Sequence, residues 1–464
     1  MHGGPETSAH ERTDQTSPHE RTDLVRATET DVDREASERP AGYPERAPQV
    51  GRLPRGRPPG RRRVRNGPIR APTVLDVGGE PSVAGTPISP RGDLFAMTIR
   101  ETVMRTPLVD GHAHPVEPLS GGTVREGFAQ YFTEGELATR DARNTLNYRA
   151  ALGVLAERFD AGPDDERTLL ERRAAVDLPS YTRECIAETG TERILADDGF
   201  PDLSPAEFRE YTDAEVHPLL RLEPLIEELL DEPRAFDEFE AAFENRIEEA
   251  LDGEHVALKT IAAYRRGLDV GAPDRADARA AFEAVRADWN GRIEHPTLLD
   301  YLLHRALGIA GERGAPVQFH TGFGDPDAHP RYVDPTLLVE CIEAHPETPI
   351  VLLHAGYPSV GEAGYLTATY PNVHLDASLA IPFAAHGAER VLSTALELAP
   401  TTKLCYGSDA FSTPELYVLA ARRFREALAA VLERLVGSGI VTGSYAEAAA
   451  ENVLRENAIR LYDL

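Results

Sequence analysis

The sequence contains few cysteines, and long apolar runs are missing. Its three cysteines, Cys185, Cys341 and Cys405, stand far apart and form no CxxC pair. A disulfide framework or a thiolate zinc site is therefore not expected. No run of roughly 18 or more apolar residues occurs, which argues against a membrane-spanning helix. Because the polar N-terminus lacks a secretory pattern, we expect a cytoplasmic protein.

Positive charge is also scarce. The chain has 49 basic against 77 acidic residues, a net charge of −28, and only Lys259 and Lys403 are lysines. This excess of negative charge would repel phosphate, so we expect no nucleic-acid partner. A large acidic excess with arginine in place of lysine resembles the proteins of halophilic archaea. In such proteins the carboxylate surface stays hydrated at high salt, and the salt screens the repulsion between the carboxylates.

The first 96 residues differ in composition from the rest. They are rich in Pro, Gly, Arg and Thr and show little apolar periodicity, as in RLPRGRPPGRRRVR from Arg52. Such a segment buries too little apolar surface to offset its ordering entropy. We therefore expect residues 1–96 to be a disordered N-terminal extension, or upstream sequence preceding a true start at Met97. A polyanion-binding arm is the functional alternative.

From residue 97 to 464, short apolar segments alternate with amphipathic helical patterns. Eight-fold alternation of this kind predicts an α/β fold, a (β/α)₈ TIM barrel with a closed parallel sheet. Expected helices include Phe236–Leu251, Thr297–Arg313, Pro335–Ala344, Glu389–Leu398, Pro414–Leu435 and the C-terminal segment Ala446–Leu464. The expected strands are Leu108–Gly111, Arg193–Ala196, His217–Leu222, Val256–Ile261, Pro316–Phe319, Ile350–Leu353, Asn372–Leu375 and Leu404–Gly407.

The connection after the first strand is longer than a βα loop requires. Residues 124–188 have helical patterns and predict a helical insertion. It could be a lid over the active site or an ordinary surface insertion.

The first strand ends in VDGHAHP, which places His112 and His114 two residues apart. Alternate residues of a strand face the same side, so both imidazoles can point toward one ion. Three later strands also lead into single polar residues, His320, His354 and Asp409, expected on strands five, six and eight. In a TIM barrel the carboxyl ends of the strands form the active face. Packing alone hardly explains so many coincidences.

An HxH pair on strand one, histidines on strands five and six and an aspartate on strand eight resemble the amidohydrolase superfamily. The branch is the one with aminocarboxymuconate decarboxylase-like and uronate isomerase-like proteins. Within it, RLE at Arg221–Glu223, LKTIAAYRRGL at Leu258–Leu268, HTGFGD and YGSDAFSTPELY are similar to the amidohydrolase domain fused to glutamine synthetase in some nodulin-like and fungal proteins. The resemblance covers roughly residues 108–464.

The resemblance implies a divalent metal held by His112, His114, His320 and Asp409. This ligand set suits zinc, with manganese or iron as rivals. Metal-bound hydroxide would then attack the substrate. Asp409 would accept the proton and pass it to the leaving group. His354 would polarise the scissile carbonyl or stabilise the oxyanion.

Lys259 stands inside the apolar strand VALKTIA, where a buried charge needs a partner or a reaction. It could clamp a substrate carboxylate, or be carbamylated and bridge a second metal as in binuclear members of the family. A structural ion pair with a carboxylate such as Glu223 is the other interpretation. Arg221 and Glu223, expected on one face of strand three, are candidate substrate contacts or an internal salt bridge.

Two further pairs of residues have open roles. Asp197 and Asp198 end strand two and could support the site or belong to the loop. His374, on strand seven with Asp376, is a spare ligand or, preferably, a structural histidine.

These predictions combine into a metal-dependent hydrolase with one or two ions, which cleaves a C–N, amide-like bond of a small carboxylate-bearing substrate. A non-oxidative decarboxylase with the same metal site is the first alternative. A non-catalytic partner of glutamine synthetase is the second. The expected partner is a small molecule, and barrels of the resembled family often form homodimers.

Overall fold

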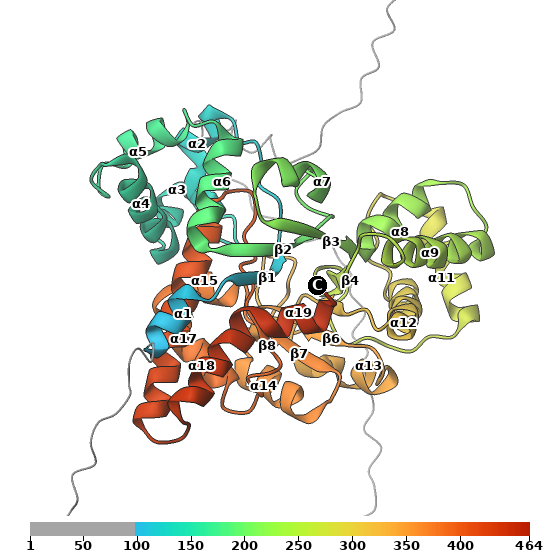
Figure 1. Cartoon of the computed structure of the whole chain (residues 1–464). Coiled ribbons are helices and arrows are strands. Elements are labelled where there is room, and N and C mark those ends of the chain that lie inside the picture. The colour runs from blue at the N-terminus through green and yellow to red at the C-terminus, as the bar shows by residue number, and fades with distance from the viewer. Residues whose placement is uncertain (1–97) are drawn as a thin grey trace, which may run out of the picture. The chain divides into compact units, whose positions relative to one another are not determined.

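The computed structural model describes residues 98–464, and Figure 1 shows its strands near the centre with helices around them. The disorder expected of residues 1–96 concerns a segment outside the described residues. Within residues 98–464, no helix combines the length and the apolar character that crossing a bilayer demands.

Eight parallel strands follow one another in chain order across a single sheet, which confirms the predicted TIM barrel. All eight lie where the apolar segments predicted them, with ends that differ by a few residues. The strands are β1 (Leu108–Ala113), β2 (Thr191–Asp197), β3 (Glu215–Arg221), β4 (Ala257–Thr260), β5 (Val317–Phe319), β6 (Ile350–Leu352), β7 (Val373–Asp376) and β8 (Leu404–Cys405).

The barrel closes between β1 and the segment that follows β8. Gly111 N donates to the Tyr406 carbonyl at 3.0 Å, and Asp409 N donates to the His112 carbonyl at 2.8 Å. Gly111 suits this approach, because a Cβ there would lie only 3.0 Å from the Tyr406 carbonyl oxygen. Closure therefore places the Asp409 loop directly beside the HAH segment of β1.

The inside of the barrel is apolar at the end opposite to the strand carboxyl ends. Val109, Leu195 and Leu219 lie there in one cluster with Ala458 and Tyr462 of the C-terminal helix α19 (Asn457–Tyr462). Burying apolar side chains, here and in the larger cluster that includes residues of the surrounding helices, is the main favourable term in folding. Helix α19 thus covers one end of the barrel, and the polar residues discussed below occupy the other.

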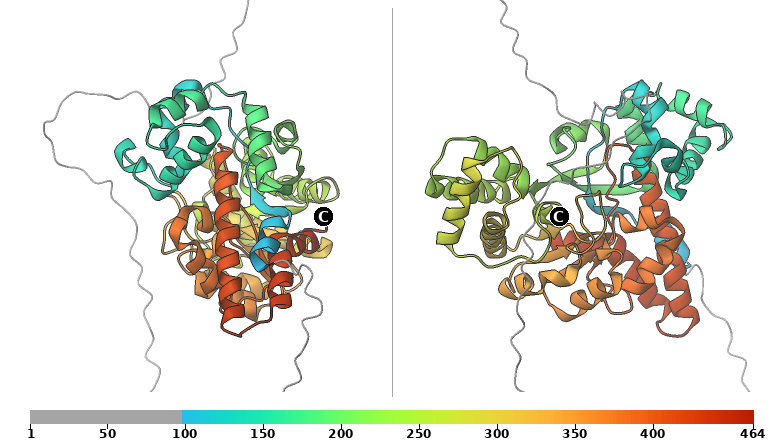
Figure 2. Two further views of the ribbon diagram at one scale, coloured as in Figure 1. Left: turned by 60° about the vertical axis from the view of Figure 1, so that its left-hand side comes forward. Right: turned by 180° about the vertical axis from the view of Figure 1, so that it is seen from behind.

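Between β1 and β2 the chain forms several helices with an apolar cluster of their own, which also takes in residues of α17. Two views place these helices together beside α17, and both α4 and α6 contact it (Figure 2). The helices are α2 (Gly121–Gly127), η2 (Phe128–Phe132), α3 (Thr139–Ala142), α4 (Leu146–Phe159), α5 (Glu166–Arg173) and α6 (Leu178–Thr189), with α17 at Glu415–Gly437.

The remaining helices connect the strands and complete the C-terminal region. The predicted helix Phe236–Leu251 is α9 with the same ends, and the other predicted helices are found with small shifts. They are α1 (Ile99–Arg105), α7 (Pro205–Phe208), η3 (Arg209–Tyr211), α8 (Leu222–Asp231), α9, α10 (Ala262–Arg265), α11 (Arg275–Ala287), α12 (Pro296–Arg313), η4 (Pro335–Leu338), α13 (Val339–Ala344), η5 (Leu353–Gly356), α14 (Val360–Thr369), α15 (Ala380–Ala384), η6 (Ala385–Gly387), α16 (Ala388–Ala395), α18 (Gly443–Glu451) and the π-helical turn η7 (Asn452–Glu456).

A buried ion pair joins the insertion to the barrel. Arg173 Nε of α5 lies 2.5 Å from Glu415 Oε1 of α17, and the side chains of both are nearly inaccessible, at 4% and 0% exposed. The Tyr181 hydroxyl of α6 donates to the same carboxylate oxygen at 2.9 Å, and the Thr413 hydroxyl donates to the other. Because the pair is so well hydrogen-bonded, its loss is felt mainly when one charge remains unpaired.

We expect Glu415→Leu to lower the free energy of unfolding by about 3–5 kcal/mol, since it leaves the Arg173 guanidinium buried without its counter-charge. The double variant Arg173→Met/Glu415→Leu should recover most of this loss. Equilibrium denaturation at one fixed salt concentration measures both.

Glu171→Leu is the matched control. It removes the exposed pair with Arg167 on the same helix α5, whose side chains are 51% and 82% exposed, and should change stability little. A Glu415→Leu protein no less stable than this control would contradict the role given to the buried pair.

Candidate metal centre

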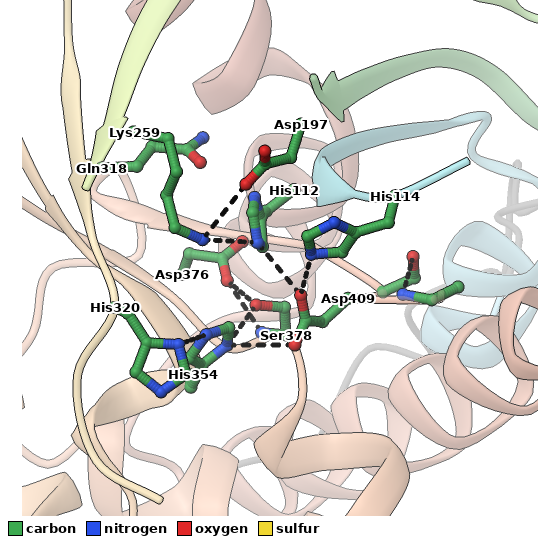
Figure 3. Close-up of polar contacts among 12 residues, drawn as sticks. His112, His114, Asp197, Lys259, Gln318, His320, His354, Asp376, Ser378 and Asp409 are labelled. Atoms are coloured by element: carbon green, nitrogen blue, oxygen red, sulfur yellow. Dashed lines mark hydrogen bonds and ion pairs between the residues drawn. The ribbon is translucent and has the colours of Figure 1, made fainter. Parts of the chain in front are cut away.

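Three of the predicted metal ligands meet at the carboxyl end of the barrel. His112 and His114 come from β1, and Asp409 comes from the loop after β8. Asp409 Oδ1 lies 3.0 Å from His112 Nε2 and 3.3 Å from His114 Nε2. All three residues are buried, and their side chains point toward one another in Figure 3.

The donor set of this cluster fits a cation. Ligand atoms bound to one ion at about 2.1 Å lie about 3.0–3.5 Å apart, and the Nε2 and Oδ1 atoms have this spacing. His112 Nε2 also lies 2.9 Å from Lys259 Nζ, although one nitrogen cannot accept from Lys259 and donate to Asp409 at once. An ion between the donors would remove this conflict. Two imidazoles and a carboxylate suit zinc, manganese or iron.

The ionisation states are those that metal ligation requires. Burial lowers the pKa of His112 to about 4, and the charge of Lys259 acts in the same direction. Burial alone would raise the pKa of Asp409, but His354 and the hydrogen bonds from His112 and His114 hold it well below its usual value. Near neutral pH the cluster therefore presents a neutral imidazole at His112 and a carboxylate at Asp409.

Two of the candidate residues have an uncommon backbone conformation. His354 has a φ of 63° and Asp409 a φ of 49°, which is the left-handed region that non-glycine residues seldom occupy. Such conformations persist where the surrounding structure holds them, and they cluster at functional sites. In this barrel they turn each side chain inward at the carboxyl end of its strand.

His320 lies beside the three-atom cluster and is connected to it through His354. His320 Nδ1 is 2.9 Å from His354 Nε2, and His354 Nδ1 is 3.7 Å from Asp409 Oδ2. The pKa of both histidines lies well below the usual value, chiefly because of burial. The position of His320 as a fourth ligand therefore stays a prediction.

Two residues at the end of β7 orient His354. Asp376 is the last residue of the strand, and Ser378 follows it in the loop. The Ser378 hydroxyl donates to Asp376 Oδ1, and Ser378 Oγ lies 2.9 Å from His354 Nδ1. This chain of contacts ends at His320, whose Nε2 lies 3.2 Å from the Phe323 carbonyl oxygen. A carbonyl oxygen only accepts, so Nε2 of His320 carries a proton while it makes this contact, and it must lose that contact to bind a metal.

Neither residue was predicted to be functional: Ser378 had no expected role, and Asp376 had only a position on strand seven. The available signal was the DAS motif in NVHLDAS, where an acid ends a strand in the same way as Asp409 follows β8. Burial raises the pKa of Asp376 to about 7. Its other oxygen, Oδ2, has no hydrogen-bond partner among residues 98–464.

Lys259 of β4 is 2% exposed and forms its ion pair with Asp197, not with Glu223. Its Nζ lies 3.7 Å from Asp197 Oδ2, and burial lowers its pKa to about 8 despite the opposing effect of Asp197. Asp197 is also bound by Arg221, with 2.7 Å between Nη2 and Oδ2. Asp197 therefore supports the site, and Arg221 forms the internal salt bridge that the sequence left open.

Glu223 does not lie on strand three, so the strand argument for placing it on one face with Arg221 does not hold. The strand β3 ends at Arg221, and Glu223 lies in the first turn of α8, where the period of two no longer holds. Glu223 is fully buried and accepts a hydrogen bond from Thr260 at 2.6 Å. Its second oxygen has no partner among the described residues, so its predicted role in substrate or second-metal binding stays a prediction.

His374 of β7 has other neighbours. Burial lowers its pKa to about 4, and the cations of Lys403 and Arg460 act in the same direction. A site flanked by two cations disfavours a metal ion, which supports the structural role for His374.

An eight-stranded barrel with such donors at the carboxyl ends of its strands defines the class of barrel enzymes that bind a divalent metal. The sequence profile of the Amidohydrolase family matches residues 109–464. The chain therefore belongs to the amidohydrolase family.

Its relatives include a Lactobacillus casei protein assigned only provisionally as a metal-dependent hydrolase. Its structure has 30% sequence identity and a TM-score of 0.73, covering 79% of this chain and 97% of that one. Protein fluG of Emericella nidulans is 29% identical over 408 residues, which is 79% of this chain. The alignment spans 47% of Protein fluG, so about half of that relative is matched. A uronate isomerase from Thermotoga maritima shares the fold, with 14% identity, a TM-score of 0.60, and coverage of 78% of this chain and 96% of that one.

We expect His112→Ala and Asp409→Ala to lose the divalent metal that copurifies with the protein, because each removes a donor from a three-atom cluster. Elemental analysis and calorimetric titration with zinc measure the stoichiometry and the affinity. His320→Ala tests the fourth position, and a roughly 10- to 100-fold weaker affinity would support it.

His374→Ala is the control, because it removes a half-buried histidine of β7 that is not part of the cluster of His112, His114 and Asp409. Equal metal content in the control and in Asp409→Ala would overturn the assignment. Two ions per chain would favour carbamylated Lys259, and one ion would favour the clamp.

Proposed function

We propose that the protein is a metal-dependent hydrolase that cleaves a C–N, amide-like bond of a small carboxylate-bearing substrate. The observation that carries the proposal is the position of Asp409. One of its oxygens faces His112 and His114, and the other faces His354. A carboxylate shared in this way can both hold a cation and exchange a proton with the reacting groups.

His112, His114 and Asp409 would hold the metal, and His320 is the proposed fourth ligand. We favour zinc, with manganese or iron as alternatives that accept the same donors. When bound, the ion supplies Lewis acidity toward water and toward the substrate carbonyl.

The chain's own groups would then move protons and stabilise charge. Asp409 accepts the proton of the attacking water and returns it to the leaving nitrogen. His354, held in place by Ser378, exchanges its Nε2 contact with His320 for the substrate oxygen and stabilises the negative charge that develops there. Lys259 lies 2.9 Å from His112 and binds a substrate carboxylate or, when carbamylated, a second ion.

The proposal also covers the domain organisation, the location and the oligomeric state of the protein. We propose that residues 97–464 act as one barrel domain, with residues 124–188 as an insertion that covers the active face. The acidic, lysine-poor composition supports a cytoplasmic enzyme that works at high salt. We also propose that the protein forms a homodimer.

Membership of the amidohydrolase family and the likeness to the Lactobacillus casei protein support a metal-dependent reaction, for which we propose hydrolysis. The decarboxylase alternative uses the same residues and differs in its product, carbon dioxide without uptake of water. The non-catalytic alternative is disfavoured because the cluster keeps its donors and their ionisation states.

We expect Asp409→Asn and His354→Ala to lower kcat by about 10²- to 10⁴-fold, because each removes a group that acts on the reacting atoms. Metal-loaded protein in high salt is assayed against γ-glutamyl amides, N-acyl amino acids and aromatic acids, with amine and carbon dioxide release measured separately. His374→Ala and the exposed Asp213→Asn should keep full activity.

Circular dichroism confirms that each variant is folded. An Asp409→Asn enzyme as active as the unmodified protein would refute the mechanism, and carbon dioxide release without amine would replace hydrolysis by decarboxylation.

A further inference from the structure

Aromatic side chains follow six of the eight strands at the carboxyl end of the barrel. Each lies shortly after its strand, and each is half-buried although most large apolar residues of the barrel are fully buried. We call them the aromatic arc: Phe200 after β2, Tyr264 after β4, Phe323 after β5, Tyr357 after β6, Phe383 after β7 and Phe411 after β8.

Five of these rings form a continuous chain of contacts. Phe200 lies 6.4 Å from Phe411, which lies 6.4 Å from Phe383, measured between ring centroids. Phe383 lies 6.3 Å from Phe323, and Phe323 lies 5.4 Å from Tyr357. Rings from five separate loops therefore meet along one line, which loop packing by itself does not require.

Two members of the aromatic arc, Phe200 and Tyr264, contact histidines of the candidate metal centre. The ring of Phe200 lies 5.8 Å from that of His114, and the Phe200 carbonyl lies 3.0 Å from His114 Nδ1. The ring of Tyr264 lies 4.3 Å from that of His320. Tyr264 also adjoins the loop of Phe323, because a Cβ on Gly324 would lie 2.0 Å from the Tyr264 hydroxyl oxygen. The aromatic arc therefore borders the polar centre.

Two of the four ring contacts are edge-to-face, one is tilted, and the Phe383–Phe411 contact is stacked at 17°. The planes of Phe323 and Tyr357 meet at 70°, those of Phe323 and Phe383 at 62°, and those of Phe200 and Phe411 at 50°. Tilted rings present both edges and faces, and an added ring gains more from them than an alkyl group of similar area. The partly exposed area of these residues is thus suited to a planar apolar ligand.

We infer that the substrate carries an aryl group, which the aromatic arc binds next to the metal centre. This inference rests on the proposed function for the position of the reacting bond, and it adds the class of substrate: an aryl-bearing amide. The carboxylate, amide and aryl parts of such a molecule then match, in order, the cationic Lys259, the Asp409 cluster and the aromatic arc.

Two pairs of probes that differ only in a phenyl or a methyl group test the inference on the full-length, metal-loaded protein. Calorimetry compares the binding of benzoate with that of acetate, and neither is turned over. Kinetics compare the hydrolysis of N-benzoylglycine with that of N-acetylglycine. We expect the phenyl member of each pair to be favoured by about tenfold or more, because it buries more apolar area.

The double variant Phe383→Leu/Phe411→Leu keeps apolar volume but removes two rings at the middle of the aromatic arc. We expect it to lose most of the phenyl preference in both assays while its metal content stays unchanged. Phe159→Leu is the matched control: its half-buried ring stacks on Tyr181 in the insertion, outside the aromatic arc. It should keep the preference.

The outcomes separate this inference from the proposed function. Benzoate bound tightly, with the preference lost in the double variant, supports the aromatic arc even if neither amide is hydrolysed, a result that would count against hydrolysis alone. Hydrolysis of both amides at similar kcat/KM, or equal binding of benzoate and acetate, overturns the aryl inference and leaves the hydrolase intact. A preference that survives in the double variant overturns it too.

Discussion

The candidate centre depends on the hydrogen bonds that close the barrel between β1 and the segment after β8. Asp409 N donates to the His112 carbonyl, and His114 N donates to the Ala410 carbonyl, both at 2.8 Å. These bonds hold the end of β1 and the segment after β8, which are far apart in sequence, in one register. Only in that register can Asp409 Oδ1 face both imidazoles. Gly111 belongs to the same constraint, because a side chain there would press on the Tyr406 carbonyl.

Near this seam, Arg221, Lys259 and Asp197 form one group of buried charges. Arg221 and Lys259 are register partners on β3 and β4, and Asp197 of β2 reaches both. Burying cations and carboxylates together avoids the cost that any one of them would bear alone. The same environment keeps His112, His320 and His354 neutral, because burial lowers the pKa of each. The barrel therefore offers unprotonated imidazoles beside an ionised carboxylate.

The features that are particular to this centre come from the segments that connect the strands. The insertion between β1 and β2 has its own apolar cluster and is joined to α17 through the Arg173–Glu415 pair. The aromatic arc comes from six βα loops. A rigid barrel that carries donors at its strand ends and selects ligands through its loops is a general property of this fold. Here the loops supply rings where the strands supply charge.

The sequence by itself determined the local features, because they depend on short periods. Alternation of strands and helices predicted the TIM barrel, and the two-residue spacing of HAH put His112 and His114 on one side. The same reasoning failed at Glu223, since the chain leaves β3 for α8 at Leu222 and the strand period ends there.

Contacts between strands were decided only by the tertiary structure. The pairing of Lys259 with Asp197, the bond from Ser378 to His354 and the separation of His320 from the three-atom cluster all depend on the register of neighbouring strands. Residues so distant along the chain meet only when the whole sheet has closed, and no local pattern encodes that distance.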